Sequence, residues 1–530
     1  MKGKFTYLNP LSITVAALVA TPIIFTIYSA VIADLELWTR LYDTRLKVIL
    51  PNTLKLLASV GFMTALIGVS TAWIVTRYDF PGRKIWQWAL ILPLSVPGYV
   101  LAYAYASIMA PGGVFQSTWT SLFGDIISPP NLYSFWGVSI ILSLVNYPYV
   151  YLLTRASLLS QNVAYDEAAR TLGVSGWKRF WSVNIRLAYP GIVAGIALAL
   201  MEVMADFGTV AMLRYPTFTE AIYRQMTARF DPSGAAALGS VLVIMTFLLL
   251  NLERYFRSRS RFEQTKGRFR TYIPTRLGLR EGIFCNGLIL FVLGIAFFAP
   301  VSMLLKWGTE AVLSGGLDSR FIGFTYNALL VSAIGATAAV VLAVPAAYLH
   351  ARKPNILNRS VFYLSTLGYS LPGPVIAVGL LLTAGIIFPW LYGGLAILIT
   401  AYVIRFIPVT IHSQDSAISS VSMSLEDASR TLGAGTWGMI RKILLPLIKP
   451  GLLTGWVIVF VDCMKELPAT LMLRPIAFDT LAVRVWMEAS EALWEMAAPP
   501  ALLIVLAGLV PIAILIRRIS RGGYNGISAV

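Results

Sequence analysis

Four carboxylates interrupt two apolar segments of this chain with the same spacing. Glu202 and Asp206 lie four residues apart, and Asp462 and Glu466 repeat that spacing in the second segment. Residues four apart on a helix share one face, so each pair is expected on one side of its helix. An ionised carboxylate deep in a bilayer costs roughly 2.5–3.5 kcal/mol, so it usually faces a cavity or a partner. Together these acids could line a route for a cation.

Structural roles for the same acids remain open at this point. Lys465 stands beside Glu466 and could neutralise a neighbour, and carboxylates near a span end can cap helices or hold two halves together. Met204 and Met464 are more typical of packing than of soft-metal binding. No metal site or catalytic group is predicted, because the two cysteines and two histidines are dispersed in the sequence: Cys285, Cys463, His350 and His412.

The composition places these acids in a membrane protein. Hydrophobic residues make up 57% of the 530 positions and charged residues 13%, whereas soluble domains carry nearer a quarter charged residues. Several apolar runs approach about 20 residues, enough to cross the hydrocarbon core. We predict an all-α protein with about twelve spans, near 11–33, 53–76, 88–109, 133–154, 190–212, 235–251, 282–306, 327–349, 360–388, 391–411, 450–472 and 499–517.

The net charge of +17 fits a membrane protein better than a nucleic-acid partner. The basic residues cluster between apolar spans, and the richest cluster is the segment 252–281. Basic loops stay on the cytoplasmic side of a membrane. With alternating spans, both termini and the 252–281 segment are therefore expected on the cytoplasmic side, with lipid and no nucleic acid around the chain.

The chain repeats itself. Gly433 follows Gly173 by 260 residues, and the two acid pairs share that offset. Earlier in each half the offset is 275, which pairs Pro97-Gly98 with Pro372-Gly373. We therefore predict two parallel six-helix repeats, 1–251 and 282–530, joined by a basic cytoplasmic linker, 252–281. The Pro-Gly pairs interrupt the third span of each repeat and are candidate hinges, with simple helix kinks as the alternative.

A short charged phrase also occurs once in each repeat, in the predicted cytoplasmic loops at about 162–190 and 422–450. It reads DEAARTLG at 166–173 and EDASRTLG at 426–433. The final glycines, Gly173 and Gly433, predict left-handed helix ends, and a second short helix should follow each. An amphipathic hairpin without a partner and a nucleic-acid-binding pair of helices are alternatives. A docking element for a two-fold symmetric cytoplasmic protein explains the repetition best.

These loops resemble the EAA loop of ABC-importer permeases. The first copy supplies Glu167, Ala168, Ala169 and Gly173, and the second supplies Asp427, Ala428 and Gly433 followed by an intact Ile-Leu-Leu-Pro at 443–446. The first copy lacks that proline. Nearly the whole chain is similar to the fused, double-length permeases of ferric-iron importers. The resemblance implies a type I importer fold in which each loop couples the membrane helices to an ATPase subunit.

The resemblance also implies partners. The phosphate-binding pattern G-x-x-x-x-G-K-[ST] is absent from the sequence, so the chain is expected to be a transporter subunit rather than an enzyme, without a cofactor of its own. ATP and magnesium would belong to two copies of a cytoplasmic ABC ATPase subunit. A substrate-binding protein would dock on the outer face, where 214–234 and 488–495 are candidate contacts.

The expected location is the bacterial cytoplasmic (inner) membrane, which the chain crosses many times. Ferric iron is the substrate that the resemblance favours. Thiamine, aminoethylphosphonate or another small solute are alternatives within the same architecture. A rival from another class is an ion-coupled secondary transporter, but that class does not explain the twin loops.

Overall fold

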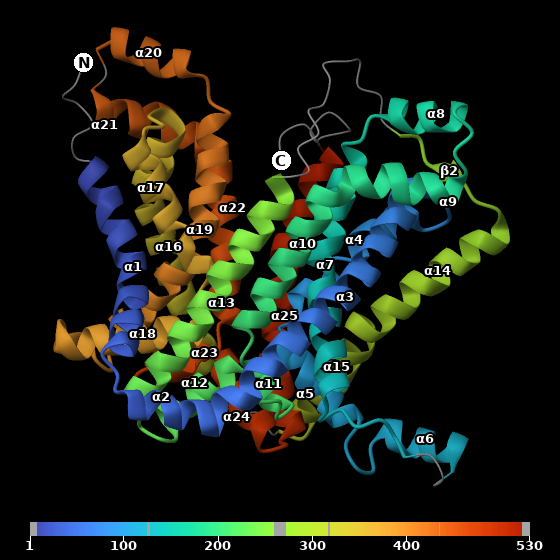
Figure 1. The fold of residues 1–530 in the computed structure, drawn as a ribbon, viewed down its shortest axis with the longest axis horizontal. Coiled ribbons are helices and arrows are strands. Elements are labelled where there is room, and N and C mark those ends of the chain that lie inside the picture. Colours follow the sequence, from blue (N-terminus) through green and yellow to red (C-terminus); the bar gives the residue numbers. More distant parts are fainter. Residues whose placement is uncertain (1–7, 125–127, 259–271, 316–318, 434, 522–530) are drawn as a thin grey trace.

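The computed structural model describes residues 8–124, 128–258, 272–315, 319–433 and 435–521 (Figure 1). The first repeat contains α1 (Leu8–Val31), α2 (Leu35–Leu41), η1 (Tyr42–Leu46), α3 (Lys47–Arg77), β1 (Tyr78–Asp79), α4 (Arg83–Ala89), η2 (Leu92–Ser95), α5 (Gly98–Ile108), α6 (Val114–Phe123), α7 (Phe135–Leu159), α8 (Val163–Thr171), α9 (Gly176–Arg179), η3 (Phe180–Asn184), α10 (Ile185–Ala205), α11 (Gly208–Met212), α12 (Phe218–Thr227) and α13 (Pro232–Ser258).

The linker end and the second repeat follow. The linker contains β2 (Thr275–Arg276). The helices after it are α14 (Leu279–Leu293), η4 (Gly294–Phe298), α15 (Ala299–Leu313), α16 (Phe321–Arg352), α17 (Ile356–Ser365), η5 (Leu367–Ser370), α18 (Gly373–Ile386), η6 (Pro389–Leu391), α19 (Leu395–Ser419), α20 (Met423–Thr431), α21 (Thr436–Met439), η7 (Ile440–Leu444), α22 (Leu445–Lys465), α23 (Pro468–Leu473), α24 (Leu481–Ser490) and α25 (Trp494–Arg521). In the described residues the two short strands form one parallel pair, which ties the end of the linker to the end of α3.

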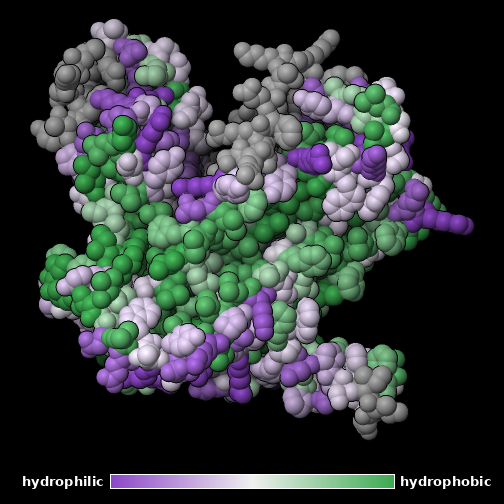
Figure 2. All heavy atoms as spheres, viewed as in Figure 1, coloured by the Kyte–Doolittle hydropathy of each residue, from purple (hydrophilic) through white to green (hydrophobic). Residues whose placement is uncertain are grey.

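The prediction of an all-α membrane protein is confirmed. Ten helices in the described ranges are long and apolar enough to span a bilayer, and two bent helix pairs raise the total to twelve if each pair is one span. Figure 2 shows an apolar belt across the middle of the molecule with hydrophilic residues gathered above and below it. That belt is the surface expected to face lipid.

The third span of each repeat is broken where the sequence predicts an interruption. The α4–η2 segment meets α5 at 90°, and the α17–η5 segment meets α18 at 113°. Pro97 and Pro372 cap the second helix of each pair, and the residues before them, Val96 and Leu371, are extended. Proline disfavours the helical conformation in the residue before it, which explains why the helix stops there.

The fifth span of each repeat differs from the prediction. The expected continuous helices over 190–212 and 450–472 end earlier, because α10 stops at Ala205 and α22 at Lys465. Asp206 and Glu466 are the extended residues that follow, with ψ of 124° and 115°. The spacing predicted that the two acids of each pair share one helix face. That prediction is wrong, because the helix ends before the second acid. The second acid of each pair instead lies in the turn that starts the next short helix.

Both repeated phrases lie on one end of the molecule. Figure 1 shows α8 and α20 together at the top of the view, on the end where α1 begins, and α6, α12 and α24 at the opposite end. We call the end that carries α8 and α20 the coupling face. Gly173 and Gly433 have φ of +73° and +83°, so the predicted left-handed helix ends are confirmed.

The two repeats interlock. Helix α1 packs against α16, α17 and α18 of the second repeat, while α15 packs against α5 of the first. The buried apolar residues accordingly form two large clusters, and each contains helices of both repeats. The boundaries 1–251 and 282–530 stay a prediction from the sequence, and each core is built from helices on both sides of them.

Small residues allow the spans to approach closely. Val150 of α7 lies between two glycines, Gly68 of α3 and Gly195 of α10, and a methyl group added to either would lie 2.7 Å from an atom of Val150. Lipid is as apolar as a side chain, so association of helices in a membrane depends on such close packing. This contact fixes α3 and α10 on both sides of α7, and α10 carries the first acid pair.

Candidate translocation cavity and coupling helices

A cavity of about 440 Å³ lies between the two repeats. Its wall contains all four acids singled out in the sequence and one of the two proline-glycine pairs. Two basic side chains and several tyrosines complete the polar lining. The polar and hinge residues are Glu202, Asp206, Asp462, Glu466, Arg405, Lys465, Asn146, Tyr99, Tyr149, Tyr369, Pro97 and Gly98.

Asp206 is held by the first turn of α11. One carboxylate oxygen accepts the backbone N–H groups of Thr209 at 3.0 Å and Val210 at 3.2 Å, and the other accepts the Thr209 hydroxyl at 2.8 Å. A carboxylate favours the positive end of a helix, which explains why α10 stops there and a new helix starts. Gly98 lies against this group, since an added methyl would sit 2.9 Å from an Asp206 carboxylate oxygen.

Glu466 occupies the equivalent turn of the second repeat. Its carboxylate accepts the backbone N–H of Ala469 at 3.1 Å and forms an ion pair with Arg405, whose Nε lies 3.3 Å from Oε2. The Glu466 side chain is 4% exposed. Gly373 lies against both partners, because an added methyl would be 2.6 Å from each. The candidate hinge of each repeat therefore touches the acid at the end of the fifth span.

The other two acids lie one turn back on α10 and α22. The hydroxyl of Tyr369, a residue of the second repeat, donates a hydrogen bond to Glu202 of the first at 2.9 Å. Asp462 forms an ion pair with Lys465 at 3.1 Å on its own helix. Tyr369 thus connects the two halves of the cavity through a carboxylate that the sequence had singled out.

On the coupling face, α8 presents an exposed surface with one buried acid. Glu167 and Ala168 are exposed, Leu172 is 82% exposed, and Ala169 is buried. Asp166 is buried and forms an ion pair with Arg179 at 2.9 Å. Asp166 therefore anchors the helix, while Glu167 and Ala168 of the EAA phrase face outward and Ala169 faces the bundle.

Helix α20 repeats this arrangement with different partners. Asp427 and Ala428 are exposed, and Leu432 is 87% exposed. Glu426 is buried and accepts the Arg352 Nε at 2.7 Å and the Tyr348 hydroxyl at 3.1 Å. The sequence analysis singled out Glu167 and Asp427 and missed these two anchoring acids, Asp166 and Glu426, although each stands directly before a residue that it singled out.

Sequence reasoning also missed the basic and aromatic partners in the cavity. Arg405 is a single arginine inside the apolar stretch 391–411, and that position alone could have drawn attention to it. Its partner Glu466 lies 61 residues further along the chain, so the pairing depends on the fold. Tyr369 gave no comparable signal.

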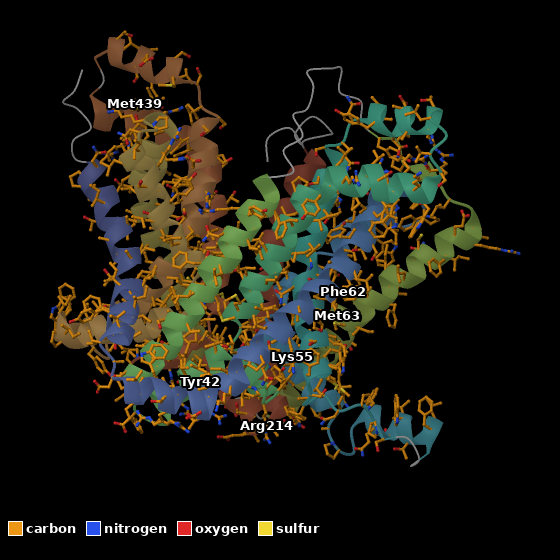
Figure 3. All side chains as sticks on the ribbon, in the orientation of Figure 1. Tyr42, Lys55, Phe62, Met63, Arg214 and Met439 are labelled. Atoms are coloured by element: carbon orange, nitrogen blue, oxygen red, sulfur yellow. The ribbon has the colours of Figure 1, made fainter. Side chains whose placement is uncertain are left out.

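The outer-loop segments lie away from the coupling face. The stretch 214–234 contains α12, and Figure 3 shows Arg214 at the end of the molecule opposite Met439. The stretch 488–495 joins α24 to α25 on that same end. Their role as contacts for a binding protein stays a prediction.

Interlocked repeats, a polar cavity between them and one exposed helix per repeat on the same face define a membrane transport permease. Consistent with this, residues 64–262 and 335–521 each match the family model of the binding-protein-dependent transport system inner membrane component. The chain belongs to that family, and its architecture is that of a type I ABC importer permease, as the resemblance predicted. It is a multi-pass subunit of an inner membrane.

Three relatives illustrate the range of the similarity. The chain is 29% identical to the Fe(3+)-transport system permease protein FbpB 2 of Haemophilus influenzae, over 90% of both chains. It is 24% identical to the putative ferric transport system permease protein FbpB 1 of the same organism, over 83% of this chain and 72% of the relative. A 29% identity to the sulfate transport system permease protein CysT of Escherichia coli covers 36% of this chain and 69% of the relative.

Proposed function

We propose that this chain is the membrane subunit of an importer for ferric iron, which a separate substrate-binding protein delivers to the outer face. The main support for ferric iron as the substrate is the similarity, along 90% of both chains, to a permease named for Fe(3+) transport. The cavity supports it, since carboxylate and phenol oxygens line the wall and hard cations prefer oxygen ligands.

The energy source in this proposal is a pair of ATPase subunits on the coupling face. Two pseudo-equivalent helices with exposed leucines, α8 and α20, fit a two-fold partner. Each is held to the spans by a buried ion pair, so a movement of the partner would be transmitted to the bundle. In this arrangement the coupling face and both termini are cytoplasmic, and ATP and magnesium are bound by the partner.

A double substitution tests the coupling role. Glu167→Ala with Asp427→Ala removes two exposed carboxylates, so the free energy of unfolding should change by no more than about 0.5 kcal/mol. Copurification of the ATPase subunits and ATPase activity stimulated by the binding protein should both fall strongly. Glu36→Ala, an exposed acid of α2 on the opposite end, is the matched control. Unchanged assembly and unchanged stimulation in the double variant would remove the coupling role.

Uptake measurements test the substrate and the energy source. Cells that depend on this chain should take up radiolabelled ferric iron and should not take up thiamine or aminoethylphosphonate through it. Vesicles without ATP should show no uptake under an ion gradient. Gradient-driven uptake in those vesicles would favour the ion-coupled secondary transporter.

A further inference from the structure

The two repeats contribute different numbers of basic side chains to the wall of the cavity. At the offset of 260, Lys465 of the second repeat corresponds to Ala205 of the first, and Arg405 corresponds to Val145. All four residues line the cavity. The second repeat therefore supplies both basic side chains of the wall, and the first repeat has small or apolar residues at the same places.

This difference decides which acids are neutralised. Asp462 pairs with Lys465 and Glu466 with Arg405, whereas no Lys or Arg in the described ranges forms an ion pair with Glu202 or Asp206. Three donors of the α11 turn satisfy Asp206. Glu202 has the hydroxyl of Tyr369 as its donor. Glu202 is thus the carboxylate of the wall that keeps its negative charge least compensated.

The tyrosines of the wall add neutral oxygen atoms to these carboxylates. Tyr99 lines the wall and is 4% exposed, yet its hydroxyl has no hydrogen-bond partner among the described residues. That hydroxyl is itself buried and lies near Glu466, so it is not part of the site proposed below. The tyrosines Tyr149 and Tyr369 line the same wall beside Glu202. Every group named here offers oxygen, which selects a hard cation over a soft one.

We propose that the cavity holds a hard trivalent cation in passage, at a station formed by Glu202 and Tyr369. Glu202 supplies the charge from the first repeat and Tyr369 the neutral oxygen donor from the second. The paired acids Asp462 and Glu466 hold the wall together and do not contact the cation. The identity of this cation as ferric iron rests on the proposed function.

The proposed station has few ligands and is therefore expected to bind the cation weakly. In the described part of the chain, no three His, Cys, Asp or Glu side chains converge on a point that could hold a metal ion. A passage site must bind well enough for entry and weakly enough for release. One carboxylate and one phenol satisfy that condition, whereas a closed chelate would trap its cargo.

The experiment exchanges the charge pattern between the repeats. Ala205→Lys copies Lys465 into the first repeat beside Glu202, and Lys465→Ala copies the first repeat into the second. Terbium(III), a hard trivalent cation whose luminescence nearby tyrosines sensitise, is titrated into the full chain in lipid nanodiscs. Ala205→Lys should weaken binding by about tenfold or more, and Lys465→Ala should strengthen it by a similar factor. Because the two effects have opposite signs, misfolding cannot mimic the pattern.

Two charge-matched variants locate the station. Glu202→Gln and Asp462→Asn each remove one negative charge from the wall, but only the first removes the proposed ligand. The loss of terbium affinity should be several-fold larger in Glu202→Gln. Equal losses, or no response to the exchange of Ala205 and Lys465, would overturn the proposal. If the terbium pattern holds but the intact importer takes up no radiolabelled ferric iron, the station stands and the iron assignment fails.

Discussion

The two repeats share one fold and distribute their polar groups in opposite ways. The first repeat gathers polar side chains beneath its coupling helix, α8, and adds no basic group to the cavity. The second repeat packs its coupling helix, α20, mainly with apolar side chains and places two basic groups in the cavity. The two repeats thus keep the same helix positions, although different side-chain contacts hold the helices there.

Beneath α8 the first repeat has a polar network. Arg77, at the end of α3, donates to Gln161 at 2.7 Å and to Asn184, and the ring of Tyr272 from the linker covers its guanidinium at 4.1 Å. A second arginine, Arg179, takes the buried acid Asp166. Several hydrogen bonds and ion pairs form this network, so the position of α8 does not depend on a single contact.

Beneath α20 the second repeat has a small apolar cluster and one central ion pair. Arg352 corresponds to Arg77 at the offset of 275 and binds Glu426 directly. Met439, labelled in Figure 3, and Leu444 stand at the offset of 260 from Arg179 and Asn184, and both are fully buried. The side chains of Arg352 and Glu426 are 7% and 3% exposed, so this pair, together with the Tyr348 hydroxyl, makes the polar contact between α20 and α16.

The largest predicted effect comes from breaking that pair. Glu426→Gln removes the carboxylate that pairs with Arg352 and leaves its buried charge with the neutral Val421 carbonyl at 2.8 Å. Removing one partner of a buried ion pair costs about 3–5 kcal/mol in comparable sites. Amide hydrogen exchange in α20 should accelerate, and ATPase activity stimulated by the binding protein should be lost. Exchange measured by mass spectrometry on the whole chain reports the first effect, and the reconstituted importer reports the second.

The matched variant in the first repeat is Asp166→Asn. Arg77 keeps Gln161 and Asn184, and Arg179 is 17% exposed, so the loss should be smaller, about 1–3 kcal/mol. An effect of Asp166→Asn on α8 as large as that of Glu426→Gln on α20 would contradict the contrast between a shared network and a single pair.

Much of this architecture could be predicted from the sequence, because offsets and hydropathy are local properties. The twin phrases, the broken third spans and the acids at the ends of the fifth spans all appear in the chain as repeats. The break after Ala205 could not be seen, since an acid four residues after Glu202 fits a helix equally well. It became a cap because the N–H groups of α11 were available.

Partners distant in the sequence could not be predicted either. Hydropathy gives the length of a span and not its neighbours, so the packing of α1 on the second repeat left no trace in the sequence. The same holds for Tyr369, which reaches Glu202 across 167 positions. Interlocked cores and cross-repeat hydrogen bonds arise only when the chain is folded.

Substitutions at the candidate hinges are expected to have effects of intermediate size that differ between the two repeats. A methyl group at Gly373 would meet Arg405, Glu466 and the rigid ring of Pro468, so Gly373→Ala must separate a buried ion pair. At Gly98 the methyl would meet Thr209 and Asp206, where the hydroxyl can turn away. Overpacking costs about 1–3 kcal/mol, and Gly373→Ala should lie at the upper end.

Thermal unfolding of the purified chain, with each variant beside the parent, measures this difference. Iron uptake in the same pair separates a packing effect from a hinge effect. A hinge role predicts that uptake falls further than the loss of stability explains. Equal thermal shifts in the two variants would mean that the ion pair does not distinguish the two repeats.

The smallest predicted effect concerns the linker, which touches the first repeat beside α8. Tyr272→Ala removes the ring over Arg77 and should cost about 0.5–2 kcal/mol locally, whereas Tyr272→Phe keeps the ring and serves as the control. The readout is the amide of Leu277, which donates to Asp79 at 3.0 Å next to the β1–β2 pair and should exchange faster in Tyr272→Ala. Because Arg352 pairs with Glu426, exchange in α20 should stay unchanged. Unchanged exchange at Leu277 in Tyr272→Ala would show that the linker does not belong to the polar network of the first repeat.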